Sequence, residues 1–267
     1  MIWPAEDLWQ AMVGSCPGIT VEVLPQIDST NSELMRRARS GLTDPVVLIA
    51  ETQTAGRGRL GRAWHGTAGD ALTFSLGLML QPADWSGLSL AVGLALARSL
   101  DPQGTLGLRL KWPNDIWVAR ADAPTGWAKL AGILIETTLP TPADASSPRY
   151  CVVGMGVNIA PPTAQDLRTQ PLGLRELQAD ASAASAVLRI APAVLNTLLA
   201  FERAGFAPLQ NAFSARDALH NQAVSLSDGR SGLACGVDAQ GALCVQTAEG
   251  MAHITSAEVS VRPQSNL

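Results

Sequence analysis

The hydrophobic pattern of this chain changes near His220, and this change limits the folds that it can adopt. Before that point, β-rich apolar runs such as residues 46–50 alternate with longer stretches of helical periodicity such as residues 187–201. After Asn221 the runs become short and alternating, and Asp-Gly, Gln-Gly and Glu-Gly pairs separate them at the spacing of hairpins in a small barrel. We therefore expect a larger mixed domain over residues 1–219 and a small β domain over residues 220–267.

Within the larger domain, apolar periodicity and turn residues predict the order of the elements. Ser29 or Thr30 is the expected N-cap of a helix, and the Trp112-Pro113-Asn114-Asp115 turn is expected to join two strands. A loop rich in proline and alanine is expected over residues 139–148. The strands are expected at residues 19–27, 46–50, 106–111, 116–118, 130–136 and 150–159, with two further short ones inside 71–80, and the helices at residues 32–40, 88–100, 187–201 and 209–219.

The composition is typical of a compact globular chain, and the net charge limits the classes of partner that it can bind. Of the 267 residues, 47% are hydrophobic and 16% charged, and the net charge of -4 argues against wholesale binding of nucleic acid. The N-terminus lacks the charged and apolar regions of a secretory signal, and the longest apolar stretch, around residues 88–100, is too short to cross a bilayer. We expect a cytoplasmic protein that does not insert into membranes.

The four cysteines are Cys16, Cys151, Cys235 and Cys244, and they are widely scattered along the chain. No two of them form a C-x-x-C pair, and no histidine stands at a metal-ligand spacing from them. The expected state is reduced thiols that mostly fill the core.

Lysine is rare, since 17 of the 19 basic residues are arginine and only Lys111 and Lys129 are lysine. A general drift towards arginine accounts for the surface. A site that needs a compact point charge on a flexible stem would nevertheless reject the planar arginine fork. The two surviving lysines are therefore candidates for function.

The segment Gly56-Arg57-Gly58-Arg59-Leu60-Gly61 matches the pattern G-x-G-x-x-G after a strand, which is typical of dinucleotide binding. The context rejects that interpretation, because no helical periodicity begins inside the motif. Neither lysine is preceded by glycine and followed by serine or threonine, so a Walker A loop is excluded too. Three arginines interleaved with glycines instead predict a mobile loop that closes over a carboxylate or phosphate; the alternative is a solvated basic turn.

Five motifs in this order resemble those of the bacterial biotin-protein ligases, in the form without an N-terminal DNA-binding domain. The resemblance covers about half of the chain. Its motifs are Asp28-Ser29-Thr30-Asn31, Gln53 with Gly56 to Arg62 and Trp64, Lys111-Trp112-Pro113-Asn114-Asp115, Lys129 to Glu136, and Gly154-Met155-Gly156-Val157-Asn158.

This resemblance implies an α+β fold with a mixed sheet and flanking helices, of the class II aminoacyl-tRNA synthetase and biotin ligase type, plus a C-terminal SH3-like β-barrel. It implies an ATP-dependent enzyme that makes biotinyl-5'-AMP with Mg²⁺. The biotin would then pass to a lysine of the biotin carboxyl carrier protein of acetyl-CoA carboxylase or another biotin-dependent carboxylase. A homodimer is possible on the same resemblance.

The resemblance also assigns residues to three roles. Lys129, Arg59 and Asp115 are the expected catalytic residues, and Asp115 is also the expected Mg²⁺ ligand. The expected biotin contacts are Ser29, Thr30, Asn31, Gln53, Arg57, Gly58, Arg59, Trp64, Lys129 and Gly132, and the expected ATP contacts are Arg57, Arg62, Lys111, Asn114 and Asn158.

Each role has a plain structural alternative. The residues from Ser29 to Asn31 are favoured helix caps, and Trp64 is equally at home in a core. Lys111 could be a surface lysine on an edge strand. Asp115 could orient a metal ion or act as a base towards the incoming amine.

Two rival functions remain. A lipoate ligase or octanoyltransferase would share the fold, and a non-catalytic nucleotide- or nucleic-acid-binding module would use the arginines as a phosphate clamp. The Gly-Arg loop argues against the first, and the second leaves Lys129 and Asp115 without a purpose. Only about 27 residues precede Asp28, so we expect no helix-turn-helix domain and no binding of operator DNA.

Overall fold

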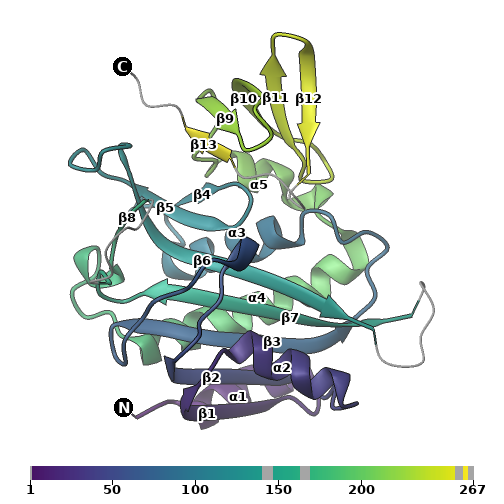
Figure 1. Ribbon diagram of the computed structural model, residues 1–267. Helices are drawn as coiled ribbons and strands as arrows, with labels where there is room; N and C mark the ends of the chain where they lie inside the picture. Colours follow the sequence, from purple (N-terminus) through teal and green to yellow (C-terminus); the bar gives the residue numbers. More distant parts are fainter. Residues whose placement is uncertain (1, 140–146, 163–168, 256–260, 264–267) are drawn as a thin grey trace.

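The computed structural model describes residues 2–139, 147–162, 169–255 and 261–263, and in it the chain forms two sheets (Figure 1). The larger sheet has eight strands in the order β1-β2-β3-β7-β6-β5-β4, with β8 paired to β6. Most neighbours are antiparallel, while β1 and β2 are parallel, as are β6 and β8. Its strands are β1 (Thr20–Ile27), β2 (Val46–Gln53), β3 (Ala71–Leu80), β4 (Arg109–Lys111), β5 (Asp115–Ala119), β6 (Trp127–Thr138), β7 (Arg149–Asn158) and β8 (Gln170–Pro171).

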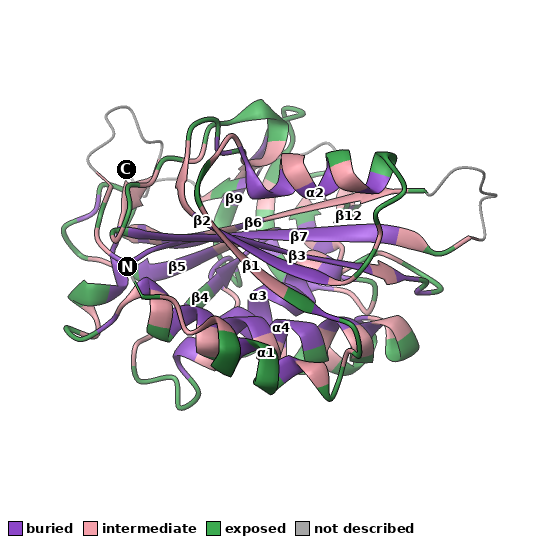
Figure 2. Ribbon diagram, turned by 90° about the horizontal axis from the view of Figure 1, so that it is seen from below, coloured by how far each residue is buried: buried purple, intermediate pink, exposed green. Residues whose placement is uncertain are grey.

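Helices cover both faces of this sheet. α2 (Thr30–Arg39) lies on one face, while α1 (Ala5–Val13), α3 (Leu88–Leu100) and α4 (Ala183–Ala204) lie on the other (Figure 2). A strand covered on both sides carries apolar residues at successive positions rather than at every second one. β3 is such a strand, buried at all positions but Met79, so the expected pair of short strands inside 71–80 is wrong and one strand takes their place.

The expectation that residues 88–100 are the longest apolar stretch is wrong, because α4 is longer and also apolar. Its 22 residues are long and apolar enough to cross a membrane when judged by length and composition alone. Nine of them are buried, and the helix packs against α3 and β3. The apolar face of α4 therefore contributes to the core over the sheet.

The smaller sheet is antiparallel and follows the larger domain in sequence. Its strands are ordered β12-β11-β10-β9-β13, which confirms the expected α+β fold class with a C-terminal β unit. The expected helix at residues 209–219 is reduced to the short α5 (Gln210–Ser214). The remaining elements are β9 (Ala223–Leu226), β10 (Ser231–Val237), β11 (Leu243–Thr247), β12 (Gly250–Ile254) and β13 (Val261–Pro263), and the 3₁₀ turns η1 (Arg59–Gly61), η2 (Leu174–Glu176) and η3 (Ala207–Leu209).

The turn between β10 and β11 packs against the larger domain. The indole Nε1 of Trp112 donates a hydrogen bond to the carbonyl oxygen of Gly241 at 3.1 Å. Gly241 has a φ of 82°, and a Cβ placed on it would lie 2.8 Å from the Cα of Gly87. A glycine is therefore required where the turn meets the start of α3.

The cysteines differ from expectation in their burial. All four are free thiols, as predicted. Only Cys151 lies fully in the core, while Cys16 and Cys244 are half-buried and Cys235 is exposed. Cys16 packs against the core, so the prediction that they mostly fill the core is wrong for Cys235 and Cys244. Of the expected loop at residues 139–148, positions 140–146 lie outside the described residues.

Candidate active site

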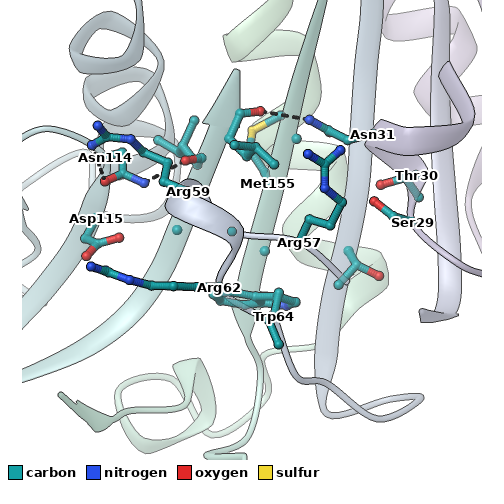
Figure 3. A pocket seen from close by; sticks show the side chains of 18 of the residues that line it. Ser29, Thr30, Asn31, Arg57, Arg59, Arg62, Trp64, Asn114, Asp115 and Met155 are labelled. Atoms are coloured by element: carbon teal, nitrogen blue, oxygen red, sulfur yellow. Dashed lines mark hydrogen bonds between the residues drawn. The ribbon is translucent and has the colours of Figure 1, made fainter. Parts of the chain in front are cut away.

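One groove brings together every predicted site residue except Asn158. It lies between the N-terminus of α2, the loop that follows β2, and the turn between β4 and β5 (Figure 3). Its empty volume, open mouth included, is about 870 Å³, which is within the range of sites for small organic ligands. The predicted residues that line it are Ser29, Thr30, Asn31, Gln53, Arg57, Gly58, Arg59, Arg62, Trp64, Lys111, Asn114, Asp115, Lys129 and Gly132.

The first wall of the groove is the N-terminus of α2. Ser29 caps the helix, its hydroxyl accepting a hydrogen bond from the backbone N–H of Ser32 at 3.4 Å. The side-chain oxygen of Gln53, at the end of β2, accepts a hydrogen bond from the backbone N–H of Thr30 at 2.7 Å. Ser29 and Thr30 are buried yet line the groove, so capping and facing a ligand are compatible.

Asn31 links this wall to the strands beneath it. Its amide nitrogen donates to the carbonyl oxygen of Leu134 at 3.1 Å and to the Glu136 carboxylate at 3.0 Å. The hydroxyl of Ser75 donates to its amide oxygen at 2.6 Å. A Cβ on Gly154 would collide with that same oxygen, so this glycine of β7 makes room for Asn31.

The Gly-Arg loop forms the second wall, and it is folded back on itself. Arg57 and Ala63 form an isolated β-bridge, and the N–H of Gly58 donates to the carbonyl oxygen of Arg62 at 2.7 Å. At its tip, Leu60 has a φ of 57° and is exposed. The turn directs the arginine side chains into the groove (Figure 3).

The three arginines have different partners. Arg57 forms an ion pair with Glu136 at 3.1 Å. Arg59 donates a hydrogen bond to the side-chain oxygen of Asn114 at 3.5 Å, and burial lowers its pKa. Arg62 extends towards Asp115 (Figure 3). Because they come from one turn, the three side chains span the groove from the α2 wall to the β4–β5 turn.

The two lysines lie on the third side. The Nζ of Lys129 forms an ion pair with the Oδ1 of Asp115 at 2.7 Å, across the neighbouring strands β6 and β5. Lys111 is 8% exposed, and burial, with further lowering by the nearby cations Lys129, Arg59 and Arg62, brings its pKa to about 8 although Asp115 opposes the shift. Lys111 is therefore a buried cation of the groove, and the interpretation as a surface lysine is wrong.

Trp64 lies across the strands rather than within the core. A Cβ on Gly132 would stand 3.3 Å from its ring, and one on Gly156 would overlap the ring. The Nζ of Lys129 lies 5.8 Å from the ring centroid, which is within cation–π range. The indole N–H is buried and has no hydrogen-bond partner among the described residues.

Asn158 is the one predicted site residue that does not line the groove. It is buried at the end of β7, and its amide donates to the carbonyl oxygen of Lys129 at 3.2 Å. Its contact is with the backbone of β6, which carries Lys129.

The groove is strongly cationic although the chain carries a net charge of -4. Its lining holds five basic side chains against a single carboxylate, that of Asp115. Such a concentration of positive charge in a partly buried groove attracts anions. An uncharged polar wall faces it, which suits a ligand with a compact polar head and an anionic tail.

Comparison with known proteins assigns this groove to a family. The model of the biotin/lipoate A/B protein ligase family matches residues 23–158, which hold all of the predicted site residues. The bifunctional ligase/repressor BirA of Escherichia coli is 35% identical over 247 residues, which cover 88% of this chain and 72% of that protein. The chain belongs to the biotin/lipoate A/B protein ligase family.

Two further matches place this ligase among the biotin protein ligases. The model of the biotin protein ligase C-terminal domain matches residues 220–262. The biotin–[acetyl-CoA-carboxylase] ligase of Paracoccus denitrificans is 32% identical over 253 residues, covering 89% of this chain and 98% of that protein. The structure of the Aquifex aeolicus biotin protein ligase in complex with biotin and ATP matches with a TM-score of 0.74 at 24% identity, over 91% of this chain and 99% of that one, and shows the shared fold.

Sequence reasoning did not assign roles to two residues that contact the side chains lining the ligase groove. Ser75 is fully buried, and Glu136 binds both Arg57 and Asn31. Ser75 lies within an apolar strand and carries no motif. Glu136 closes the motif that begins at Lys129, and its charge in a β-run was a usable signal.

Proposed function

We propose that this chain activates biotin with ATP to give biotinyl-5'-AMP and pyrophosphate in the groove, and then transfers biotin to a lysine of a biotin carboxyl carrier protein. The observation that carries the proposal is the Lys129–Asp115 ion pair, which lies among the three loop arginines and opposite the polar α2 wall. The family assignment supplies the reaction class, and the structure in complex with biotin and ATP belongs to a protein of the same fold.

Recognition of biotin is assigned to the α2 wall and Trp64. A ureido ring presents one carbonyl oxygen and two N–H groups, which short hydroxyl and amide side chains such as those of Ser29, Thr30 and Asn31 can match. Leaving one such buried partner without a hydrogen bond costs about 1 to 3 kcal/mol. The indole of Trp64 covers the other side of the bound acyl chain.

The first chemical step joins two anions. The biotin carboxylate oxygen attacks the α-phosphorus of ATP, forming the mixed anhydride while the bond to the pyrophosphate oxygen breaks. The cations of the groove hold both reactants and offset the charge that develops in the transition state. We assign Lys129 to the carboxylate and α-phosphate, with Arg57 and Arg59 closing over them.

The nucleotide side is assigned to Arg62, Lys111 and Asn114. Lys111 is buried and shares the groove with four other cations. Because the local dielectric is low, its attraction to a bound polyanion is stronger than it would be in water. Asn158, which contacts the backbone of Lys129, is assigned a positioning role in place of direct contact with ATP.

The residues of the groove fit a Mg²⁺ ion that is held mainly by the nucleotide. Asp115 is the single carboxylate of the lining, and its Oδ1 is paired with Lys129. Mg²⁺ sites commonly combine one or two carboxylates with phosphate oxygens and waters. Asp115 would hold the ion together with the phosphates of the nucleotide, and the ion would neutralise phosphate charge when bound.

In the second step the acceptor lysine attacks the carbonyl carbon of the anhydride, and AMP leaves. A lysine with an ordinary pKa is neutral in only about one molecule in a few thousand at pH 7, so a base near the attacking amine accelerates transfer. Asp115 is the candidate base, because its carboxylate is the single one that lines the groove. Asp115→Asn separates its roles: loss of transfer from preformed adenylate supports the base, whereas loss of adenylate formation alone supports the metal.

The proposal also includes the wider setting of the enzyme. We propose a catalytic unit over residues 1–219 and a C-terminal unit over 220–267, acting in the cytoplasm as a homodimer. Absence of binding to operator DNA stays a prediction, tested by a gel shift with the promoter fragment of its own gene.

The test of function is transfer. The chain is incubated with ATP, Mg²⁺, biotin and a biotin carboxyl carrier domain, and the carrier mass is measured. We expect the carrier to gain the mass of one biotinyl group, and to gain nothing when its acceptor lysine is replaced by arginine. A carrier modified by lipoate or octanoate in preference to biotin would overturn the proposal.

A further inference from the structure

A second cluster of ligating side chains lies in the C-terminal sheet, outside the groove. Cys244 on β11 and His253 on β12 are register partners, so their side chains lie on the same face. Asp238 follows β10 directly. The Nδ1 of His253 lies 2.8 Å from the Oδ2 of Asp238 and 3.8 Å from the Sγ of Cys244. All three ligand atoms lie within 4.8 Å of one another.

The backbone fixes the Asp238 carboxylate in this arrangement. Its Oδ1 accepts hydrogen bonds from the N–H groups of Gln240 at 3.0 Å and Ala242 at 2.9 Å. Its Oδ2 is thereby directed at the imidazole of His253. A carboxylate held by second-sphere hydrogen bonds, beside an imidazole and a thiol, is how proteins orient metal ligands before the ion arrives.

The spacing between Cys244 and His253 fits tetrahedral zinc. With Zn–S of about 2.3 Å and Zn–N of about 2.0 to 2.1 Å, a tetrahedral ion separates sulfur from nitrogen by about 3.6 Å. The observed separation between Cys244 and His253 is 3.8 Å. Tetrahedral Zn–N and Zn–O bonds separate nitrogen from oxygen by about 3.4 Å, so the 2.8 Å contact of His253 with Asp238 would open by roughly half an ångström. Each protein ligand would then take one vertex, and water the fourth.

We propose that Asp238, Cys244 and His253 form a zinc site with three protein ligands. A surface ion pair between His253 and Asp238 needs no thiol, yet the half-buried Cys244 completes the cluster. Sulfur and imidazole ligands favour zinc over the hard cations Mg²⁺ and Ca²⁺. The site is therefore chemically distinct from a nucleotide-bound Mg²⁺ in the groove.

The position of the cluster gives the ion a structural role. Asp238 opens the turn whose Gly241 accepts the hydrogen bond of Trp112, the residue before the Pro113 turn of the groove. Zinc would tie this turn to β11 and β12, and so stabilise the surface that the smaller sheet presents to the larger domain.

The test measures zinc on the full-length chain. The protein is stripped with a chelator, and its affinity for Zn²⁺ is measured by competition with a chromophoric chelator. The Co²⁺ form is then examined for a thiolate charge-transfer band. We expect one equivalent of Zn²⁺ and such a band. Losing one orienting second-sphere partner typically costs 10- to 100-fold in affinity. Because Cys244→Ser and His253→Gln remove a direct ligand, each should weaken binding at least about 100-fold.

Matched controls are Cys16→Ser and His220→Gln, which alter a thiol and an imidazole outside the cluster. Both should keep wild-type affinity, and circular dichroism should show that all four variants are folded. The inference is overturned if the wild type binds no stoichiometric Zn²⁺, if Cys244→Ser binds it as tightly as the wild type, or if the Co²⁺ form lacks the charge-transfer band. Transfer of biotin is measured separately, so failure of the zinc site and failure of the proposed function are distinguishable.

Discussion

At the scale of the residue, Lys111 lies in the wall of the groove, its Nζ 5.6 Å from the centroid of the Trp117 ring. Its pKa falls from 10.5 to about 8 because burial disfavours the charged form. The folded chain therefore bears the cost of a buried cation below pH 8, and its stability rises as the pH increases from about 8 to 10.5, where the unfolded chain still binds the proton.

Lys111→Met is expected to stabilise the chain without ligands. A shift of this size corresponds to about 3 kcal/mol, so at pH 7 the variant should gain roughly 1 to 3 kcal/mol in the free energy of unfolding, measured in urea. It should bind ATP more weakly. A variant that is less stable than the wild type would contradict this account of the buried charge.

The same pKa predicts the pH dependence of ATP use. As the pH rises through about 8, Lys111 of the free enzyme loses its proton and the groove loses one positive charge. The kcat/KM for ATP should fall over this range in the wild type. The profile of Lys111→Met should lack that inflection, and an identical fall in both proteins would show that another group titrates.

Lys129 is the residue on which adenylate formation depends in this account. Removal of one preorganised charge-stabilising group from an active site commonly costs 10²- to 10³-fold in rate. Lys129→Met should lose at least that much pyrophosphate exchange while circular dichroism stays unchanged. Arg203→Met, which removes an exposed cation from α4, is the control that should keep full exchange.

Gly156 tests the placement of Trp64. A methyl group at this position overlaps the indole ring and displaces it from the groove. Displacement by about 1 Å can cost 10²-fold in rate, so Gly156→Ala should raise the KM for biotin and lower kcat/KM by about that factor. Gly14→Ala, whose added Cβ meets nothing within 4 Å, should behave as wild type. Wild-type kinetics in Gly156→Ala would remove Trp64 from the site.

At the scale of the element, the Gly-Arg loop is held to β6 by the ion pair between Arg57 and Glu136. An incoming biotin carboxylate competes with Glu136 for the guanidinium and is repelled by it. Glu136→Gln keeps an acceptor for Asn31 but removes the charge, so the KM for biotin should fall several-fold. An increase of similar size would show that Glu136 holds the loop in its binding conformation.

Most of the helices and strands were predictable from hydrophobic periodicity and from the turn residues between them. Residues 46–50 and 88–100 were expected as a buried strand and a helix, and β2 and α3 lie there. Burial was harder to infer, because Lys111 ends a short strand whose surroundings come from segments distant in sequence. Ser75 was missed for the same reason, since its partners are on α2.

The cluster of Asp238, Cys244 and His253 was equally invisible in the sequence. Its members stand 6 and 9 positions apart, which matches no common ligand spacing. They meet only because β11 pairs with β12 and the turn after β10 folds back beside them. The residues of the groove were recognised because they lie in short motifs, in which residues close in sequence are also close in space.

At the scale of the whole molecule, Gly241 lies where the smaller sheet meets the larger domain, against Gly87 and Trp112. Gly241→Ala adds the strain of a left-handed residue and an overlap with Gly87, whereas Gly229→Ala, at a φ of 92° with nothing within 4 Å, adds only the strain. Gly241→Ala should therefore lose at least about 1 kcal/mol more stability than Gly229→Ala in urea unfolding. Equal losses would show that this contact does not stabilise the molecule.

The central claim is that one cationic groove with a polar wall activates biotin. The measurement that tests it most directly is exchange of labelled pyrophosphate into ATP by the wild-type chain, in the presence of biotin, lipoate or octanoate. We predict exchange that requires biotin and stays at background with the other two acids. Exchange driven by lipoate or octanoate in the absence of biotin, or no exchange with biotin, would contradict the account.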